Sequence, residues 1–480
     1  MGEMDVTSRE RGTGGAQLEP SGERRGADAV HLLSGGILLG DWSGGGIIRD
    51  GAVAWSGCTV LETGTREALE ARHPRAVRHE ARGGWMAPGL INAHHHIYSA
   101  LAVGLDPGMP MADFRERLDR LWWRLDRALD EASIRVSARV AAFRSIQAGC
   151  TTVVDHHASP GVITGVLDVL AEELEEAGLS AVLCYEATDR NSHREALRGL
   201  EESARFRDAV RAHPRFRGLM GLHASFTLTD ESLARAAELA EGGDIHIHAG
   251  EDRLDGEETR GRHGVGPVER LDRFGLLGDR SWIAHGVHLD RAELGLLAER
   301  GALLLHNPES NANNQVGRLA LGAARAAGVR VALGTDGMSP CVLSAVRSAF
   351  LLHRAGEPDT EAGWKEITGL LDGARDSLAA LFQQPGYGRL EPGAPADIVV
   401  LDPAPAEAVG HASLAAHLVF GMSPPRVRHT IARGAFLLRD FEPVRQDAAK
   451  LAREAEPVRG ALWDRFRRLA PGTPYLGPDR

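Results

Sequence analysis

Residues 89–96 read GLINAHHH, a short apolar run that ends in three histidines. Seven further apolar runs follow, and longer amphipathic stretches such as residues 112–129, 133–148 and 160–177 separate most of them. Alternation of short strands with helices is typical of βα units and a parallel sheet. Eight such units in about 250 residues predict an α/β fold, a closed (β/α)8 TIM barrel. The seven further runs are TTVVDHH (151–157), SAVLCYE (180–186), RGLMGLH (217–223), DIHIHAG (244–250), SWIAHG (281–286), ALLLHN (302–307) and VRVALGTD (329–336).

Strand-like sequence also flanks the predicted barrel, which covers residues 86–385. Residues 29–85 consist of short apolar runs split by turn residues, with a helical insert at 65–72, and similar runs return within residues 386–440. These flanks predict a small composite β-domain built from both chain ends. Residues 1–28 are almost free of aliphatic side chains and predict a disordered tail. Residues 441–480 predict a C-terminal helical segment with a break at Pro457.

The composition is that of an ordinary soluble globular protein. The net charge of −11 argues against a nucleic-acid ligand, because phosphate binding needs a basic face. No apolar run reaches the ~18 residues of a membrane helix, and no signal peptide is recognisable. The cysteines lack CxxC spacing, so a reducing, cytoplasmic location is expected. These cysteines are Cys58, Cys150, Cys184 and Cys341.

Histidines gather at the carboxyl ends of the predicted strands, where barrel active sites form. His94 and His96 lie two residues apart, so both point to one face of the first strand while His95 points away. With His248 and Asp336 they predict a set of three nitrogens and one oxygen. That set suits Zn²⁺, with Fe²⁺ as the alternative. Further histidines at strand ends are His156, His157, His223, His246, His285 and His306.

Glu251 follows His248 by three residues, where the fifth strand would turn over a metal. A carboxylate there can take a proton from a metal-activated water and pass it to a leaving group. A single HxH triplet is more often a packing accident, but five strand ends in order with competent residues are not. The run LWWRL (121–125) is interpreted as helix packing rather than as a substrate platform.

Five motifs in this order resemble the amidohydrolase superfamily: PGLINAHHH (88–96), HAGE (248–251), IAHGVHLD (283–290), HNPESN (306–311) and GTDG (334–337). The branch is the one that contains cytosine, guanine and S-adenosylhomocysteine deaminases and triazine hydrolases. HHHIYSAL (94–101), LWWRLDRAL (121–129), TTVVDHHASP (151–160) and LCYEATDRN (183–191) are most similar to SsnA-type aminohydrolases. The resemblance extends over nearly the whole chain, including PGAPADIVVLDP (392–403) in the second flank.

The resemblance implies a metal-dependent hydrolase of a non-peptide C–N bond, an aminohydrolase that releases ammonia from an amino-substituted heterocycle. A metal-activated water would attack the carbon that bears the amino group, with Glu251 as proton shuttle and His285 beside the developing tetrahedral oxygen. The metal ligands implied by the motifs are His94, His96, His248 and Asp336, and the catalytic residues are Glu251, His285 and Asp336.

The resemblance also implies that His223 hydrogen-bonds the substrate, and His157, at the end of the second strand, and Asn311 are further candidates for substrate binding. One departure is ANNQVG (312–317), where relatives often carry a Leu-containing turn, and this loop would shape the pocket. The roles of four residues after the second and third strands stay open, with substrate selection as the interpretation: Asp155, Glu186, Asp189 and Arg190.

The positions of the two lysines predict how many metal ions the chain binds. Binuclear members of the superfamily usually bridge two metals with a carbamylated lysine on the fourth strand. Here that strand holds His223, and both lysines, Lys365 and Lys450, lie outside the predicted barrel strands. One divalent metal per chain is therefore expected.

Two other functions stay open. A cyclic amidase or lactamase of the same fold would open a ring without releasing ammonia. A catalytically inactive scaffold would be expected to lose ligands, and the five central residues are all present. The expected partner is a small-molecule substrate, with neither nucleic acid nor membrane, and a homodimer is left open.

Overall fold

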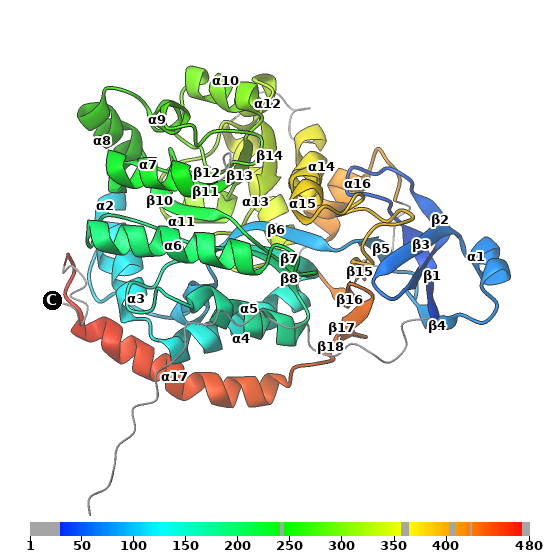
Figure 1. Ribbon diagram of the computed structural model, residues 1–480. Helices are drawn as coiled ribbons and strands as arrows, with labels where there is room; N and C mark the ends of the chain where they lie inside the picture. The colour runs from blue at the N-terminus through cyan, green and yellow to red at the C-terminus, as the bar shows by residue number, and fades with distance from the viewer. Residues whose placement is uncertain (1–28, 241–243, 357–363, 403–408, 423–424, 473–480) are drawn as a thin grey trace, which may run out of the picture.

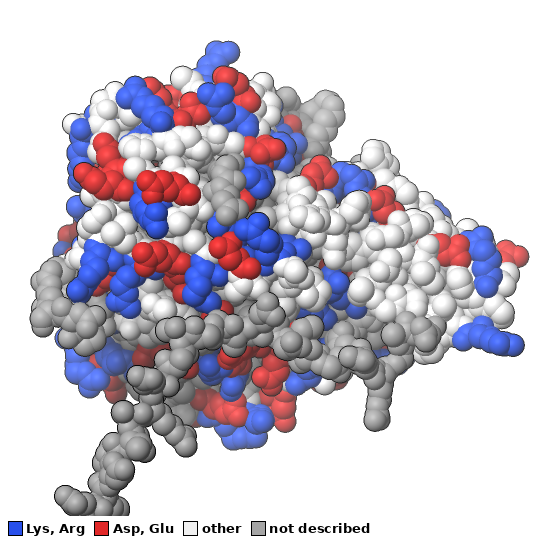
Figure 2. Space-filling view, in the orientation of Figure 1, with Lys and Arg blue, Asp and Glu red and all other residues white. Residues whose placement is uncertain are grey.

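The computed structural model describes residues 29–240, 244–356, 364–402, 409–422 and 425–472, and the predicted tail at 1–28 lies outside them. A barrel ringed by helices forms the larger body, and a smaller β-domain stands at its side (Figure 1). Basic and acidic side chains are interspersed over the barrel helices on the face seen in Figure 2. None of the described helices is long and apolar enough to cross a membrane.

The barrel consists of parallel strands in two hydrogen-bonded runs, β6–β9 and β10–β14. Bridges between Ala187 and Leu222 and between His95 and Asp336 join the two runs at both edges and close the barrel. The fold class, a (β/α)8 barrel with a β-domain from both ends, is thereby confirmed. The strands are β6 (Leu90–His95), β7 (Cys150–His157), β8 (Ser180–Tyr185), β9 (Phe216–Gly218), β10 (Met220–Ala224), β11 (Ile245–Ala249), β12 (Trp282–His285), β13 (Leu303–His306) and β14 (Arg330–Leu333).

The fourth strand, predicted as one run over 217–223, is divided into β9 and β10 at Leu219. β9 pairs with β8, whereas β10 pairs with β11. Gly221 lies in β10, two residues after this division, and a side chain there would collide with the Tyr185 carbonyl, since a Cβ would lie 2.1 Å from that oxygen. The glycine therefore lets the two runs meet.

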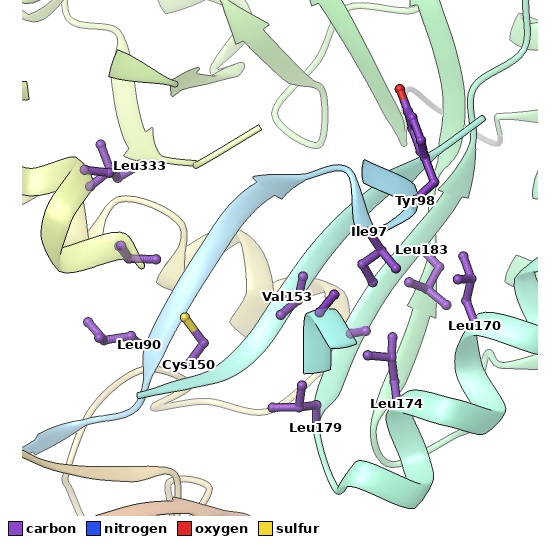
Figure 3. Close-up of a cluster of buried hydrophobic side chains, with 14 of the residues drawn as sticks. Leu90, Ile97, Tyr98, Cys150, Val153, Leu170, Leu174, Leu179, Leu183 and Leu333 are labelled. Carbon is purple, nitrogen blue, oxygen red and sulfur yellow. The ribbon is translucent and has the colours of Figure 1, made fainter. Parts of the chain in front are cut away.

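Amphipathic helices cover the outside of the barrel. Leu170 and Leu174 of α5 point toward Leu183 of β8 and Val153 of β7 (Figure 3). The covering helices are α4 (Glu131–Gln147), α5 (Val166–Ala177), α6 (His193–Ala209), α7 (Asp230–Leu239), α8 (Arg253–His263), α9 (Pro267–Arg273), α10 (Arg291–Arg300), α11 (Pro308–Asn313), α12 (Leu321–Ala326), α13 (Val342–Gly356), α14 (Trp364–Asp372) and α15 (Arg375–Phe382).

The segment after β6 departs from the continuous helix predicted over 112–129. After a 3-10 turn, η1 (Ile97–Ala102), it forms α2 (Phe114–Arg117), a π-helical turn η2 (Leu118–Trp122) and α3 (Trp123–Ala128). A π turn widens the helix and shifts the face that later residues occupy. The aromatic pair Trp122 and Trp123 lies at this junction.

The β-domain joins both flanks of the barrel in one sheet. Met86 of β5 pairs with Val400 of β15, and this antiparallel contact connects the N-terminal strands to the C-terminal ones. Trp55, Ile398 and Ile431 are fully buried in its core. Its elements are β1 (Val30–Leu38), β2 (Ile48–Ser56), β3 (Thr59–Thr65), α1 (Arg66–Arg72), β4 (Val77–Glu80), β5 (Trp85–Pro88), β15 (Ile398–Leu401), β16 (Val427–Ala432), β17 (Ala435–Arg439) and β18 (Glu442–Pro443). Two short helices, α16 (Leu414–Ala416) and η4 (His417–Gly421), precede β16.

The last helix, α17 (Ala448–Arg468), runs across the barrel helices (Figure 1). The break predicted at Pro457 is wrong, because the helix continues through it. Pro457 is exposed, so water can satisfy the carbonyl that lacks a partner. Buried Leu462 and Phe466, together with the bond from Trp463 Nε1 to the Leu101 carbonyl at 2.8 Å, hold the helix against the barrel.

Candidate active site

Four side chains converge at the carboxyl end of the barrel: His94, His96, His248 and Asp336. Each offers one ligand atom, and the four atoms lie within 4.8 Å of one another. Asp336 Oδ1 is 3.0 Å from His96 Nε2 and 3.6 Å from His94 Nε2. His96 Nε2 lies 3.3 Å from His248 Nε2. This is the ligand set that the sequence predicts.

The remaining ring nitrogens of two of these histidines contact backbone oxygens. His96 Nδ1 donates to the carbonyl of His156 at 2.5 Å, and His248 Nδ1 donates to that of His223 at 2.8 Å. In the neutral rings both Nε2 lone pairs then face each other, which is unfavourable without a cation between them. His94 Nε2 is buried and has no hydrogen-bond partner among the described residues. The donor set therefore fits a divalent metal ion.

His246 lies two residues before His248 on β11, so both side chains point to the same face of the strand. His94 Nδ1 lies 2.9 Å from Nε2 of His246, and His246 Nδ1 lies 3.8 Å from the thiol of Cys184. A proton on His94 Nδ1 leaves its Nε2 lone pair free for a metal. His246 therefore orients a ligand instead of being one.

Glu251 lies beside the ligand set, at the turn after β11. Its Oε2 is 3.6 Å from His285 Nε2, and its Oε1 accepts from Asn314 Nδ2 at 3.2 Å. Burial raises the pKa of Glu251 above its usual value. The turn is fixed by Asp255, whose carboxylate accepts from the backbone N–H of Gly250 at 2.8 Å.

Two functional residues have left-handed backbone. His285 has φ 77° and Asp336 has φ 55°, a region that residues other than glycine rarely adopt. The Asp336 carbonyl accepts from His95 Nδ1 at 2.7 Å, its backbone N–H donates to the His94 carbonyl at 2.9 Å, and its carboxylate accepts from Ser310. These bonds hold Asp336 in a conformation that aims it at the histidines.

The pocket over this cluster has an aromatic side and a polar side. Leu118, Trp122 and Trp123 form the aromatic side. The other lining residues are His96, Tyr98, Asp126, Glu186, His223, His248, Glu251, His285, Asn314, Asp336 and Gly337.

Comparison with known proteins identifies the family. A family model described as "Amidohydrolase family" matches residues 85–437. The chain is 29% identical over 433 residues to the 5-methylthioadenosine/S-adenosylhomocysteine deaminase of Nitratidesulfovibrio vulgaris, with 88% of this chain and 95% of the relative covered. It is 30% identical over 372 residues to the 5'-deoxyadenosine deaminase of Methanopyrus kandleri, with 76% and 83% covered. The chain belongs to the amidohydrolase family.

A solved structure shares the fold. The crystal structure of an adenosine deaminase from Xanthomonas campestris with bound zinc has a TM-score of 0.77 and 23% identity, and the match covers 92% of this chain and 99% of that one. The predicted membership of the amidohydrolase superfamily is confirmed, and with it the prediction of a hydrolase.

Of the three substrate residues predicted for this amidohydrolase, His223 alone lines the pocket. Its Nδ1 lies 2.7 Å from Thr227 Oγ1, and its Nε2 is 3.6 Å from Glu186 Oε1. His157 is fully buried, 2.9 Å from Ser159 Oγ. Asn311 is also buried, 2.8 Å from His285 Nδ1. Neither residue lines the pocket, and substrate contact by these two residues stays a prediction.

The four residues left open in the sequence occupy different places. Glu186 lines the pocket, and burial raises its pKa to about 7. Arg190 forms a buried ion pair with Asp126. Asp155 accepts from the Ile97 N–H at 2.6 Å, and Asp189 accepts from that of Thr229 at 2.8 Å, which are structural roles.

Several residues that line the pocket are not predicted by the sequence. Trp122 and Trp123 line the pocket, contrary to the interpretation of LWWRL as helix packing alone. Tyr98 turns its hydroxyl away from the apolar cluster around Ile97 (Figure 3). The loop ANNQVG (312–317) was expected to shape the pocket, and Asn314 is the residue that reaches it.

Proposed function

We propose that this amidohydrolase is a metal-dependent aminohydrolase that releases ammonia from an amino-substituted heterocycle. The observation that carries the proposal is the place of Glu251, which lies in the pocket next to Asp336 and His285 but outside the four-residue ligand set. A carboxylate in that position can move protons at the reacting carbon without being consumed as a ligand. The names of the relatives, which are deaminases, support the choice of reaction.

We assign one divalent metal to His94, His96, His248 and Asp336, with Zn²⁺ preferred and Fe²⁺ as the alternative. A metal in this site would lower the pKa of a coordinated water toward ~7 and so supply a nucleophile at neutral pH. His246 and the carbonyls of His156 and His223 support the set by holding the Nδ1 protons of the three histidines.

Glu251 takes the proton of the attacking water on one carboxylate oxygen and delivers it to the leaving nitrogen. Its raised pKa suits both transfers, because a carboxylate with a pKa nearer neutrality accepts and returns a proton with little energy difference. Asn314, 3.2 Å from Oε1, fixes the carboxylate so that Oε2 is the oxygen that faces His285.

His285 stabilises the oxygen that gains negative charge as the substrate carbon becomes tetrahedral. Its Nε2 points to the space between Glu251 and Asp336, 3.6 Å from Oε2 of the first and 3.9 Å from Oδ2 of the second. Asn311 Oδ1 accepts from the opposite ring nitrogen, Nδ1, and keeps the imidazole in this orientation, so Nε2 donates to the oxygen that gains charge when the ring carries a proton there as well. A donor fixed before the reaction contributes more than one that must reorient.

The test is an ammonia-release screen of metal-loaded protein against aminopurines, aminopterins and aminopyrimidines, with Glu251→Gln as the inactive control. We expect at least one class to release one equivalent of ammonia and to gain an oxygen at the amino-bearing carbon. A ring-opened product without ammonia would replace the proposal by the cyclic amidase alternative. If none of these heterocycles and no cyclic amide is hydrolysed, the result would favour the inactive scaffold.

We further propose a cytoplasmic location, supported by four described cysteines that are all free thiols. Fractionation of cells that produce the tagged protein measures this directly. A homodimer stays a prediction, and sedimentation velocity of the purified protein would test it.

A further inference from the structure

Glu186 is a buried carboxylate in the pocket that the proposed proton transfer does not use. It follows β8 and is 4% exposed, yet no side-chain hydrogen bond joins its carboxylate to another described residue. Its nearest polar neighbours are His156 Nδ1 and His223 Nε2, each at 3.6 Å. Both distances exceed hydrogen-bond length, so neither histidine occupies the acceptor oxygens of Glu186. The carboxylate therefore has acceptor capacity that the described residues do not use.

Asp126 presents a second acceptor to the same pocket. One of its carboxylate oxygens is paired with Arg190, and the other is buried without a hydrogen-bond partner in the described chain. Asp126 is 1% exposed, so water does not replace the missing partner readily. Arg190 in turn lies 5.0 Å from the ring centre of Trp123, which fixes the pair against the aromatic side.

The aromatic side suits a flat ligand. Trp122 and Trp123 line the pocket, and the ring of Trp123 meets His223 edge-on, with ring centres 5.9 Å apart. Planar heterocycles pack favourably against such surfaces. A ring placed there has its edge within the space that Glu186 and Asp126 also line.

The other carboxylates of the pocket have cationic partners. Glu251 and Asp336 would face a divalent ion, and Asp126 faces Arg190. Glu186 has no hydrogen-bond partner among the described residues, and a carboxylate oxygen accepts hydrogen bonds. The ligand group that fits these two carboxylates is therefore an N–H donor.

We infer that Glu186 and Asp126 form a recognition wall for N–H donors, and that the substrate is a flat aminoheterocycle with a second amino group on the edge that meets this wall. This inference rests on the proposed aminohydrolase activity, whose substrate class it narrows. Glu186 is then the residue that distinguishes an amino group from a carbonyl group at that edge.

The test measures binding in a protein that cannot turn over. Metal-loaded Glu251→Gln is titrated calorimetrically with two matched pairs, 2,4-diaminopyrimidine against cytosine and 2,6-diaminopurine against 6-amino-2-oxopurine. Each pair keeps the ring and one amino group and exchanges the second amino donor for a carbonyl acceptor. We expect the diamino member of at least one pair to bind about 10- to 100-fold more tightly, as for a hydrogen bond to a charged group.

Glu186→Gln in the same background should reduce that ratio by about tenfold or more, because the amide offers a donor as well as an acceptor. Asp126→Asn should reduce it less, since Arg190 remains. Glu201→Gln, on the exposed side of α6, is the matched control and should leave the ratio unchanged. An unchanged ratio in Glu186→Gln, or no binding by either diamino compound, would overturn the inference.

Measurement of the metal content of Glu186→Gln distinguishes a substrate-binding role of Glu186 from metal coordination. His96, His156, Glu186 and His248 also lie close enough to share an ion, within 4.8 Å. If Glu186→Gln loses the tightly bound metal, Glu186 is a ligand and the inference is wrong. If no compound releases ammonia from the wild-type protein while the Glu186-dependent binding ratio persists, the proposed reaction fails and the recognition wall stands.

Discussion

His94 Nδ1 lies 2.9 Å from His246 Nε2, so the tautomer of a candidate metal ligand is set by a histidine one layer deeper in the barrel. Replacement of such a partner typically costs 10- to 100-fold in metal affinity. We expect His246→Ala to weaken metal binding to about this extent while the fold persists. Competition with a chromogenic chelator measures the affinity, and circular dichroism checks the fold.

A suitable comparison for that variant is His306→Ala, because His306 is 3% exposed and no described hydrogen bond or ring contact joins it to the four ligands. It should retain metal affinity within about threefold, a difference well below the loss expected for a ligand partner. Equal losses in the two variants would mean that His246 acts only through general packing.

Glu251→Gln should retain its metal and lose activity. The residue lies outside the ligand set, so its amide leaves coordination intact, whereas proton transfer contributes about 10²- to 10⁴-fold to such reactions. Elemental analysis together with kcat/KM on the substrate found in the ammonia screen decides this. Turnover near the wild-type value at full metal occupancy would remove Glu251 from the mechanism.

Purified protein should contain close to one equivalent of Zn or Fe per chain. The fourth strand carries His223 where a bridging lysine would be needed for a binuclear site, and Lys450 lies in α17, away from the barrel strands. Removal of the ion by dialysis against a strong chelator should lower the melting temperature, because an ion bound only by the folded state stabilises it. Two equivalents that both resist mild chelation would contradict the assignment.

Stability should fall in mild acid, and His79 in the β-domain is one of the groups that contribute to this fall. Burial first, and then the neighbouring His31, lower the pKa of His79 to about 4 from an ordinary value near 6.5. Between these values the unfolded chain binds a proton that the folded chain does not, so the free energy of unfolding decreases as the pH falls through this window. Urea midpoints at pH 7 and pH 4.5 measure the loss.

His79→Gln should lose less stability over the same pH interval than the wild-type protein, since it removes that proton uptake. His411→Gln, at an exposed position, is the matched control and should follow the wild type. A pH dependence in His79→Gln as steep as that of the wild type would show that other groups dominate.

Local periodicity accounts for what the sequence predicts well. A strand alternates its side chains with a period of two, so the spacing of His94 and His96 fixes their common face without knowledge of the fold. The closed barrel then brings His248 and Asp336 to the same rim because all the strands are parallel. Each step uses a regular geometry, which is why the ligand set could be named in advance.

The pocket wall depends on irregular geometry. The π turn at Leu118–Trp122 changes the helical register, and no spacing rule for an ordinary helix places both Trp122 and Trp123 on the pocket side. Asn314 reaches Glu251 from the end of α11, and Asp126 enters through its pairing with Arg190, 64 positions away along the chain. Such contacts are set by tertiary packing rather than by local pattern.

The left-handed backbone conformation at His285 and Asp336 lowers the stability of the folded protein. Such a conformation costs a residue with a Cβ ~1–2 kcal/mol, which glycine avoids and asparagine partly avoids. A substitution that relieves this strain, such as Asp336→Asn, would change a side chain of the proposed metal site, so stability gained there would be accompanied by a loss of activity. Improvement of this protein for use at high temperature requires that both codons be held fixed and that added stability be sought elsewhere in the chain.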